Sequence, residues 1–135
     1  VTILNLVKYQ ANEICLAAIN YSPNALKYIK KQTIELCLES IKIFPSALQY
    51  INIKNQTEQI CIDACKQDGF ALQYVKTQSE QICMEAVKQN GFALQYVKNQ
   101  TNEICLEAMK QNSEVLQFVK NDLQHLFKNW NVFIY

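Results

Sequence analysis

Apolar residues in this chain follow two patterns that alternate, and each pattern returns after about 22 residues, a period typical of repeat proteins. One is the short motif Ala-Leu-x-Tyr. The other is a stretch with apolar residues at i, i+1, i+4 and i+5, as in Ile104, Cys105, Ala108 and Met109. The second spacing is helical, because a half-buried strand would alternate apolar and polar residues. The chain therefore predicts alternating helical segments joined by very short turns.

Two anchors give the length of the repeat. The motif starts at Ala25, Ala47, Ala71, Ala93 and Val115, and the cysteine anchors are Cys15, Cys37, Cys61, Cys83 and Cys105. Both sets advance by one constant interval, except that the step between their second and third members is longer because of two extra residues within Ile51–Lys54. A unit this short cannot bury its apolar face alone, so a repeat of this kind predicts a stacked array in which neighbours complete the core.

The half-unit that contains the cysteine predicts a helix of about ten residues. Its expected N-caps are Thr33, Thr57, Ser79 and Thr101, followed in the first turn by Glu35, Glu58, Glu80 and Glu103. A capping hydroxyl and an early acid both favour a helix start. Lysines end these helices at Lys42, Lys66, Lys88 and Lys110, each three residues after an acid.

The other half-unit predicts a helix of about eight residues, for example Gly91 to Lys98. Pro23 and Pro45 align with Gly69 and Gly91. Proline favours the first helical position, so we expect the N-cap just before it, with Ser22, Asp68, Asn90 and Asn112 as suitable residues and Phe44 as an exception.

The chain ends and the unit boundaries follow from these patterns. A degenerate copy of the first half-unit, Leu4–Lys8, opens the chain, and the residues from 121 onward predict an amphipathic capping helix through Leu123, Leu126, Phe127 and Trp130. Phe133, Ile134 and Tyr135 would fold back on this cap or mark a truncation. The predicted units lie near 3–20, 22–43, 44–67, 68–89, 90–111 and 112–120, with the cap at 121–135. Because the chain starts with Val1, in mid-unit, we expect a fragment of a longer repeat protein.

The predicted fold class is an all-α solenoid of about five to six two-helix repeats with a C-terminal capping helix. A leucine-rich-repeat-like fold is the less favoured alternative, since a period of about 22 residues fits that class and Leu94-x-Tyr96-x-x-Asn99 resembles its strand signature. The asparagine does not recur in every unit at the Asn99 position: Lys31 and Thr77 stand there in earlier units, and Asn121 in the last.

The stretch from Asn90 to Lys98, followed by Glu103 to Ala108, resembles a known family of short repeats. The family is catalogued as a domain of unknown function and is plentiful in giant amoebal viruses of the mimivirus type. The resemblance covers roughly residues 3–120, with the poorest fit in the first unit and in Ile51–Lys54. It implies an all-helical repeat array; it implies no activity and no site residues.

Composition and motifs argue against catalysis. The single His125 lies in the predicted cap, no Cys-x-x-Cys occurs, and the two glycines stand one full repeat apart, so neither a zinc site nor a phosphate loop is indicated. Cysteines of adjacent helices, about 8–10 Å apart, are too distant for a disulfide. We therefore expect that the protein is not an enzyme and binds no cofactor, metal or small-molecule substrate. We also expect the thiols to be buried and the protein to reside in a reducing intracellular compartment, which is the host cytoplasm if the source is viral.

Two polar rows are the candidate interaction residues. The first is the lysine row, Lys30, Lys54, Lys76, Lys98 and Lys120, which has a further copy at Lys8. The second is the glutamine row, Gln49, Gln73, Gln95 and Gln117. The net charge is +1, all 13 basic residues are lysine, and no apolar run is long enough for a membrane span, so no membrane partner is indicated. The predicted function is a non-catalytic protein–protein interaction or scaffold role. The alternative is nucleic-acid binding along the lysine row.

Overall fold

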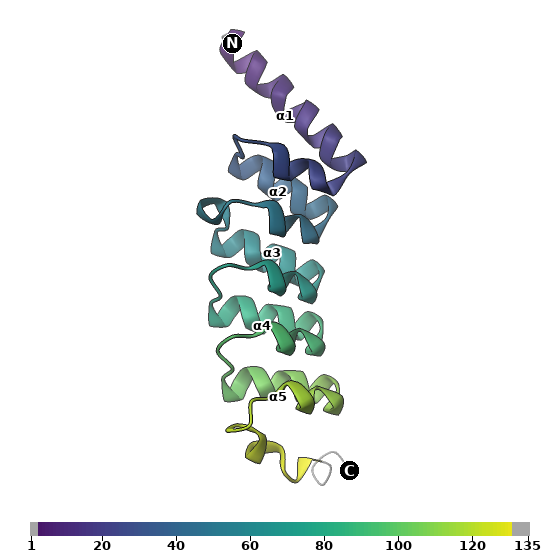
Figure 1. The fold of residues 1–135 in the computed structure, drawn as a ribbon, viewed down its shortest axis with the longest axis vertical. Coiled ribbons are helices and arrows are strands. Elements are labelled where there is room, and N and C mark those ends of the chain that lie inside the picture. The colour runs from purple at the N-terminus through teal and green to yellow at the C-terminus, as the bar shows by residue number, and fades with distance from the viewer. Residues whose placement is uncertain (1–2, 131–135) are drawn as a thin grey trace.

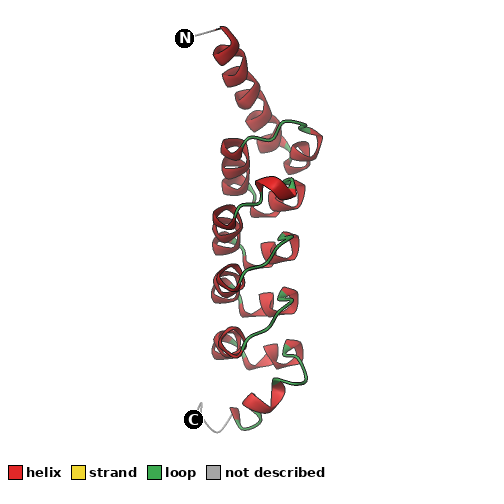
Figure 2. Ribbon diagram, turned by 90° about the vertical axis from the view of Figure 1, so that its left-hand side faces the viewer, coloured by secondary structure: helices red, strands yellow, loops and turns green. Residues whose placement is uncertain are grey.

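The protein is described by a computed structural model that places residues 3–130, with side chains from residue 11 onward. Throughout this range the regular structure is helical, as predicted, and successive units stack into a column (Figure 1). Long α-helices form one layer of the column and short 3-10 helices form the other (Figure 2). Residues 3–130 hold no strand, so the leucine-rich-repeat-like alternative is wrong.

The α-helical layer begins with α1 (Ile3–Tyr21) and continues through α2 (Ile34–Ile43), α3 (Glu58–Gln67), α4 (Glu80–Gln89) and α5 (Asn102–Gln111). From α2 onward the predicted N-caps are confirmed. The hydroxyls of Thr33, Thr57, Ser79 and Thr101 each accept a hydrogen bond from the backbone N–H three residues later, at 3.1–3.3 Å. The sequence determines these helix starts locally, because a capping hydroxyl pairs a donor that has no partner inside the helix.

The second layer consists of η1 (Pro23–Tyr28), η2 (Pro45–Tyr50), η4 (Gly69–Tyr74), η5 (Gly91–Tyr96) and η6 (Ser113–Phe118). Proline or glycine at the first helical position is confirmed, and the side chains of Asp68, Asn90 and Asn112 cap as predicted. Ser22 makes no side-chain cap bond. The predicted longer helices, such as Gly91 to Lys98, are wrong: these are 3-10 helices of 6 residues that end at the tyrosine.

The core lies between the two layers and between successive units. Each 3-10 helix contributes a leucine, and each α-helix contributes an isoleucine or leucine, a cysteine and a small residue. The fully buried examples in one unit are Leu94, Ile104, Cys105 and Ala108, each 0% exposed. Helices as short as these are unstable in isolation in water, so this shared core is what holds each unit in shape.

The first unit departs from the prediction of a separate helix over Leu4–Lys8. Residues 3–21 form one continuous helix, α1, which is tilted away from the column (Figure 1). The position that holds Thr33, Thr57, Ser79 or Thr101 in later units holds Ala11 here. Alanine cannot cap and is the strongest helix former, so the helix runs through this point.

The insertion of two residues makes room for an additional short helix of 3 residues, η3 (Ile53–Asn55). Asn55 is buried, and its side-chain amide donates to the backbone oxygen of Gln32 at 3.0 Å. The insertion is therefore tied to the preceding unit, while Ile53 is 62% exposed.

The C-terminal cap is shorter than predicted. Up to Trp130 it contains the 3-10 helix η7 (Gln124–Phe127) with turns on either side. Phe127 is buried and packs edge-on against Trp130 at 5.6 Å, whereas Leu126 is 43% exposed. A tight turn thus docks Phe127 on the last unit without a full amphipathic helix. The expectation for Phe133, Ile134 and Tyr135 lies outside the described residues.

Both glycines mark a close approach between the 3-10 helix and the α-helix of one unit. A Cβ at Gly69 would collide with the backbone oxygen of Ala86 in α4, and a Cβ at Gly91 would meet the oxygen of Ala108 at 3.1 Å. The backbone N–H groups of Gly69 and Gly91 donate to the side chains of Gln89 and Gln111, at the end of the α-helix of the same unit. Proline has no N–H to donate, and Gln67, which occupies the matching place opposite Pro45, bonds within its own helix instead.

Gly69→Ala is therefore expected to destabilise the protein by about 1–3 kcal/mol, because the added methyl group forces α4 away from η4. Gly91→Ala is the matched control and should cost clearly less, since its contact is tight but short of a collision. Urea unfolding of both variants measures the difference. Equal losses would show that the close approach at Gly69 is not the cause.

Candidate interaction surface

Each 3-10 helix of the second layer presents side chains at i and i+3, and an exposed residue follows two positions after its end. In η4 Phe70 and Gln73 overlie one another, because side chains three residues apart do so in a 3-10 helix, and Lys76 follows after the extended residue Val75. The predicted glutamine row, Gln49, Gln73, Gln95 and Gln117, is exposed in every unit. Each amide donates to the backbone oxygen three residues earlier, at 3.0–3.2 Å, which leaves its oxygen facing solvent.

A second set of glutamines, which we name the bridging glutamines, ties each unit to the next. These residues are Gln32, Gln56, Gln78 and Gln100. The Nε2 of Gln78 donates to the backbone oxygen of Tyr96 at 2.7 Å, and its Oε1 accepts from the backbone N–H of Lys98 at 3.0 Å. The other three make the same pair of bonds to the following unit.

These bonds explain why the 3-10 helices end early. The backbone oxygen of Tyr96 and the N–H of Lys98 are both taken by Gln78 of the preceding unit. Neither group is then available to continue a helix, so the chain leaves η5 in an extended conformation at Val97. The bridging glutamines thus place the lysine that follows each 3-10 helix.

The lysine row is exposed at all the predicted positions, Lys30, Lys54, Lys76, Lys98 and Lys120; Lys8 precedes the described side chains. The hydrogen bonds show one difference in register. Gln32 accepts from the N–H of Asn52, which is the place that Lys76, Lys98 and Lys120 occupy in later units. Lys54 lies instead on the inserted helix η3. We define the 3-10 face as the exposed glutamine row together with Lys30, Asn52, Lys76, Lys98 and Lys120.

Aromatic side chains connect successive units along this face. Phe70 packs edge-on against Tyr96 at 6.0 Å between ring centres, and Phe92 packs edge-on against Phe118 at 6.3 Å. In the earlier units the same place is polar, and the hydroxyl of Tyr50 donates to Asn24 at 2.6 Å. The tyrosines of the repeated motif are half-buried except Tyr28, which is 74% exposed, so they serve the packing between units.

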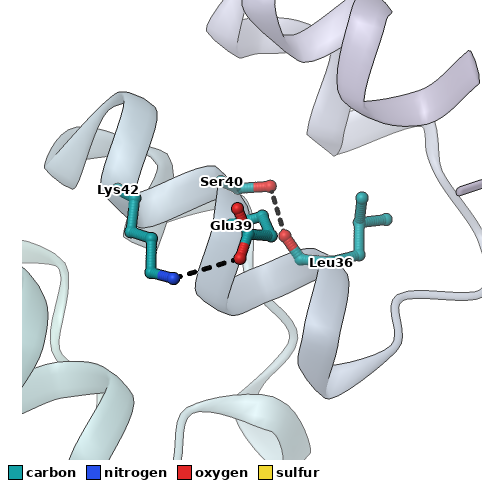
Figure 3. Close-up of polar contacts among 4 residues, drawn as sticks. All are labelled: Leu36, Glu39, Ser40 and Lys42. Atoms are coloured by element: carbon teal, nitrogen blue, oxygen red, sulfur yellow. Dashed lines mark hydrogen bonds and ion pairs between the residues drawn. The ribbon is translucent and has the colours of Figure 1, made fainter. Parts of the chain in front are cut away.

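Ion pairs do not cancel the charges of the 3-10 face among the residues that the structure describes. Of the predicted pairs at the helix ends, Lys42 with Glu39 forms at 3.1 Å (Figure 3), and it is the only ion pair within the described residues. Glu58, in the first turn of α3, accepts a hydrogen bond from the hydroxyl of Ser79 at 2.6 Å. Lys120 is held along the row, since its ammonium donates to the backbone oxygen of Lys98 at 2.7 Å.

A shallow cleft of about 200 Å³ lies between two successive units on this edge. Its lining includes Lys76, Lys98, Gln78, Glu80 and Thr101. The cleft combines ammonium groups with the first turns of α4 and α5, and Glu80 reduces its positive charge. Its size and openness suit a side chain of a larger partner better than a free substrate.

Five of the six cysteines recur once per unit and form a ladder behind the bridging glutamines: Cys15, which is half-buried, and the buried Cys37, Cys61, Cys83 and Cys105. All six are free thiols, and those of Cys83 and Cys105 donate to the Oε1 of Gln78 and Gln100 at 3.3 and 3.5 Å. Burial raises the pKa of Cys37, Cys61 and Cys83 to about 11 and that of Cys65 to about 12. At neutral pH these thiols are protonated, and a protonated thiol is a poor nucleophile and a poor metal ligand.

The thiols of the ladder are not placed for activation. Their side-chain partners among the described residues are glutamine amides, and His125 is exposed at the C-terminal cap. Within the same part of the chain, no three His, Cys, Asp or Glu side chains gather into a group that could hold a metal ion. The ladder therefore has the geometry of a core element.

The raised pKa values predict that stability falls at alkaline pH. A thiol that ionises near 9.0 when unfolded but near 11 when folded favours the folded state fully below pH 9. That contribution, about 1.4 kcal/mol per pKa unit, is lost as the pH rises from about 9 to 11. Urea midpoints at pH 8 and pH 10.5 measure the loss, and Cys65→Ala should show a smaller one. An unchanged pH dependence in Cys65→Ala would contradict this assignment.

The bridging glutamines were missed by the sequence interpretation. They do carry a signal, because glutamine stands five residues before every ladder cysteine, including Gln10 before Cys15. Glutamine is usually solvated, and only the contacts between units show that these side chains bind backbone groups.

The fold and this surface define the class of the protein as an all-α repeat solenoid whose units are joined by side-chain to backbone bonds. The model of a family described as a domain of unknown function, DUF4116, matches residues 33–78, 57–101 and 79–124. The matches start at the N-caps Thr33, Thr57 and Ser79 and together span more than half of the chain, so the chain belongs to this family. Neither the curated proteins nor the solved structures gave a match. In residues 3–130 no helix is both long and apolar enough to cross a membrane.

Proposed function

We propose that this chain is a non-catalytic scaffold that binds other proteins through its 3-10 face. The observation that carries the proposal is the pair of bridging glutamine bonds, which holds the backbone of the exposed lysine, and of the aromatic residue next to the exposed glutamine, in the same way in successive units. A rigid, repeated surface loses little conformational freedom on binding, and this favours an extended partner. The buried, protonated thiols and the exposed His125 support a role without catalysis.

The second candidate is nucleic-acid binding along the lysine row. The exposed ammonium groups of this row, and the cleft that Lys76 and Lys98 share, support it. The aromatic rings are less favourable to it, because those of Tyr96 and Phe118 are engaged edge-on by phenylalanines of the preceding unit. Bases stack on open ring faces.

The free thiols support a reducing compartment, which is the intracellular location expected from the sequence. The arginine-free composition, with lysine as the sole strong base, is in keeping with the proposed giant-virus source and, in that case, with the host cytoplasm.

The test is a selection of peptides from a random displayed library on immobilised protein. The result we expect is a set of peptides that bind the wild-type chain and lose binding when Gln73, Gln95, Lys76 and Lys98 are all changed to alanine. The matched control changes Gln59, Gln81, Lys66 and Lys88, exposed residues of the α-layer, to alanine. Failure to select any peptide, or equal loss in both variants, would overturn the proposal. Retention of an oligonucleotide at low salt but not at high salt would favour the second candidate.

A further inference from the structure

We infer that the partner of the 3-10 face is an acidic peptide in an extended, polyproline II-like conformation, with a carboxylate at every third residue. This inference rests on the proposed function and names the chemistry of the partner. It follows from the spacing, the charge and the chemical lining of the face.

The spacing comes from the stacking of units. Helices that pack side by side lie about 8–10 Å apart, so equivalent atoms of adjacent units repeat at about that distance. A polyproline II helix has three residues per turn and rises about 3.1 Å per residue, so it repeats about every 9 Å. One turn of such a peptide therefore matches one unit, and its side chains at i, i+3 and i+6 meet the same position of successive units.

The charge at that position is positive and well placed. The backbone N–H groups of Lys76, Lys98 and Lys120 are each held by a bridging glutamine, at 2.9–3.0 Å, so their Cα atoms have a common register. Their side chains are exposed and form no ion pair with an acid of the described residues. Glu80, Glu103 and Asp122 are the acids nearest in sequence to the three lysines. Glu80 and Glu103 lie in the first turns of α4 and α5, where the helix dipole offsets their charge, whereas Asp122 lies in the turn after Lys120 and reduces the positive charge at that end of the row.

The lining beside the lysines suits a peptide backbone. Edge-on aromatic pairs, Phe70 with Tyr96 and Phe92 with Phe118, form half-buried ridges that cross from unit to unit. A polyproline II segment needs only apolar contact with aromatic side chains, whereas a base needs an open ring face on which to stack. The exposed glutamines supply amide oxygens as acceptors and so pair the N–H groups of such a peptide, which has no internal hydrogen bonds.

A duplex nucleic acid fits this spacing poorly. Each of its strands carries a phosphate about every 3.4 Å along the axis, so nearly three phosphates would face each lysine. A carboxylate at every third peptide residue gives one charge per unit. The match in charge density therefore favours the peptide.

The row has one defect that makes the inference testable by gain of binding. Asn52 occupies the register position of the lysines, and Lys54 stands two residues further along on η3. A peptide that extends from the unit of Lys76 toward Lys30 thus meets a neutral side chain. Asn52→Lys completes the row, whereas Lys54→Gln removes an equal charge outside the register.

The experiment measures binding by fluorescence anisotropy of labelled synthetic peptides. The first peptide is (Glu-Pro-Pro) repeated over five turns, and the second has the same composition with its glutamates consecutive. We expect the spaced peptide to bind about tenfold more tightly, with an affinity that falls as salt rises. A (Lys-Pro-Pro) peptide of the same length should not bind.

Variants test the register. Loss of each exposed ion pair should weaken binding of the spaced peptide about two- to fivefold, so Lys76→Gln with Lys98→Gln should weaken it about tenfold. Asn52→Lys should strengthen it about two- to fivefold. The control pair, Lys66→Gln with Lys88→Gln, removes the same charge from the α-layer and should leave binding unchanged.

Equal binding of the spaced and consecutive peptides, or no gain in Asn52→Lys, would overturn the inference. Where library peptides still bind the 3-10 face in that case, the scaffold proposal stands and only the partner chemistry is wrong. Where neither library nor spaced peptides bind, both proposals fail. Tighter binding of a single-stranded oligonucleotide than of the spaced peptide would also contradict the inference.

Discussion

Replacing Gln78 by methionine is expected to lower the free energy of unfolding by about 2–4 kcal/mol. The amide of Gln78 pairs the backbone oxygen of Tyr96 and the backbone N–H of Lys98, which belong to the next unit. Methionine has a similar length and makes neither bond, and each half-buried group left without a partner costs about 1–3 kcal/mol. Urea unfolding followed by circular dichroism measures the loss.

The chain offers a matched control in Gln95→Met. Gln95 also recurs once per unit, but it is exposed and its amide bonds only to Phe92 within its own 3-10 helix. The same substitution there should change stability by less than about 0.5 kcal/mol. A similar small change at Gln78 would mean that water replaces its bonds and that the bridging glutamines do not hold the units together.

Features that depend on neighbouring residues in the sequence were predictable. Thr33 and Thr57 cap the α-helices because the hydroxyl reaches an N–H three residues away, whatever surrounds them. Pro45 marks the first helical position because its ring sets the backbone angle. The alternation of helices and the shared core followed from the period of the repeat, and the family match confirms the repeat.

Features that depend on contacts between units were not predictable in the same way. The end of η5 at Tyr96 is set by Gln78 of the unit before it, a residue that looks like any solvated glutamine. The pairing of Gly91 with Gln111, at 2.9 Å, likewise links residues of two different helices, η5 and α5, that lie 20 positions apart in the sequence. Local propensity contains no information about either bond.

The candidate surface shows the same division. The exposure of the glutamine and lysine rows was predictable, because lysine and glutamine favour solvent at the same place in each unit. The register at the insertion was ambiguous. Lys54 stands two residues before Gln56, and Asn52 stands two residues after Tyr50, as the lysine does in other units. Only the bond from Asn52 to Gln32 shows which residue takes the lysine position in the stack.

The other large effect is expected from Leu94→Ala, at about 2–5 kcal/mol. Leu94 is 0% exposed and lies in η5, in the interior of the column, where units on both sides enclose it. Its truncation leaves a cavity that the surrounding helices fill only in part. Because each unit draws its core from its neighbours, the loss should appear in the unfolding of the whole array, measured by circular dichroism.

Leu116→Ala is the matched control, since Leu116 holds the same place in η6 but is only half-buried. It lines a shallow cleft with Phe127 and Trp130 at the C-terminal end, so its truncation should cost about 1–2 kcal/mol. Trp130 is the only tryptophan and reports on this end of the column. In an array stabilised by neighbours, Leu116→Ala should shift the fluorescence transition more than the circular dichroism transition, and Leu94→Ala should shift both. Identical shifts of the two probes in Leu116→Ala would mean that the chain unfolds as a single unit, with cooperativity stronger than the contacts between its repeats imply.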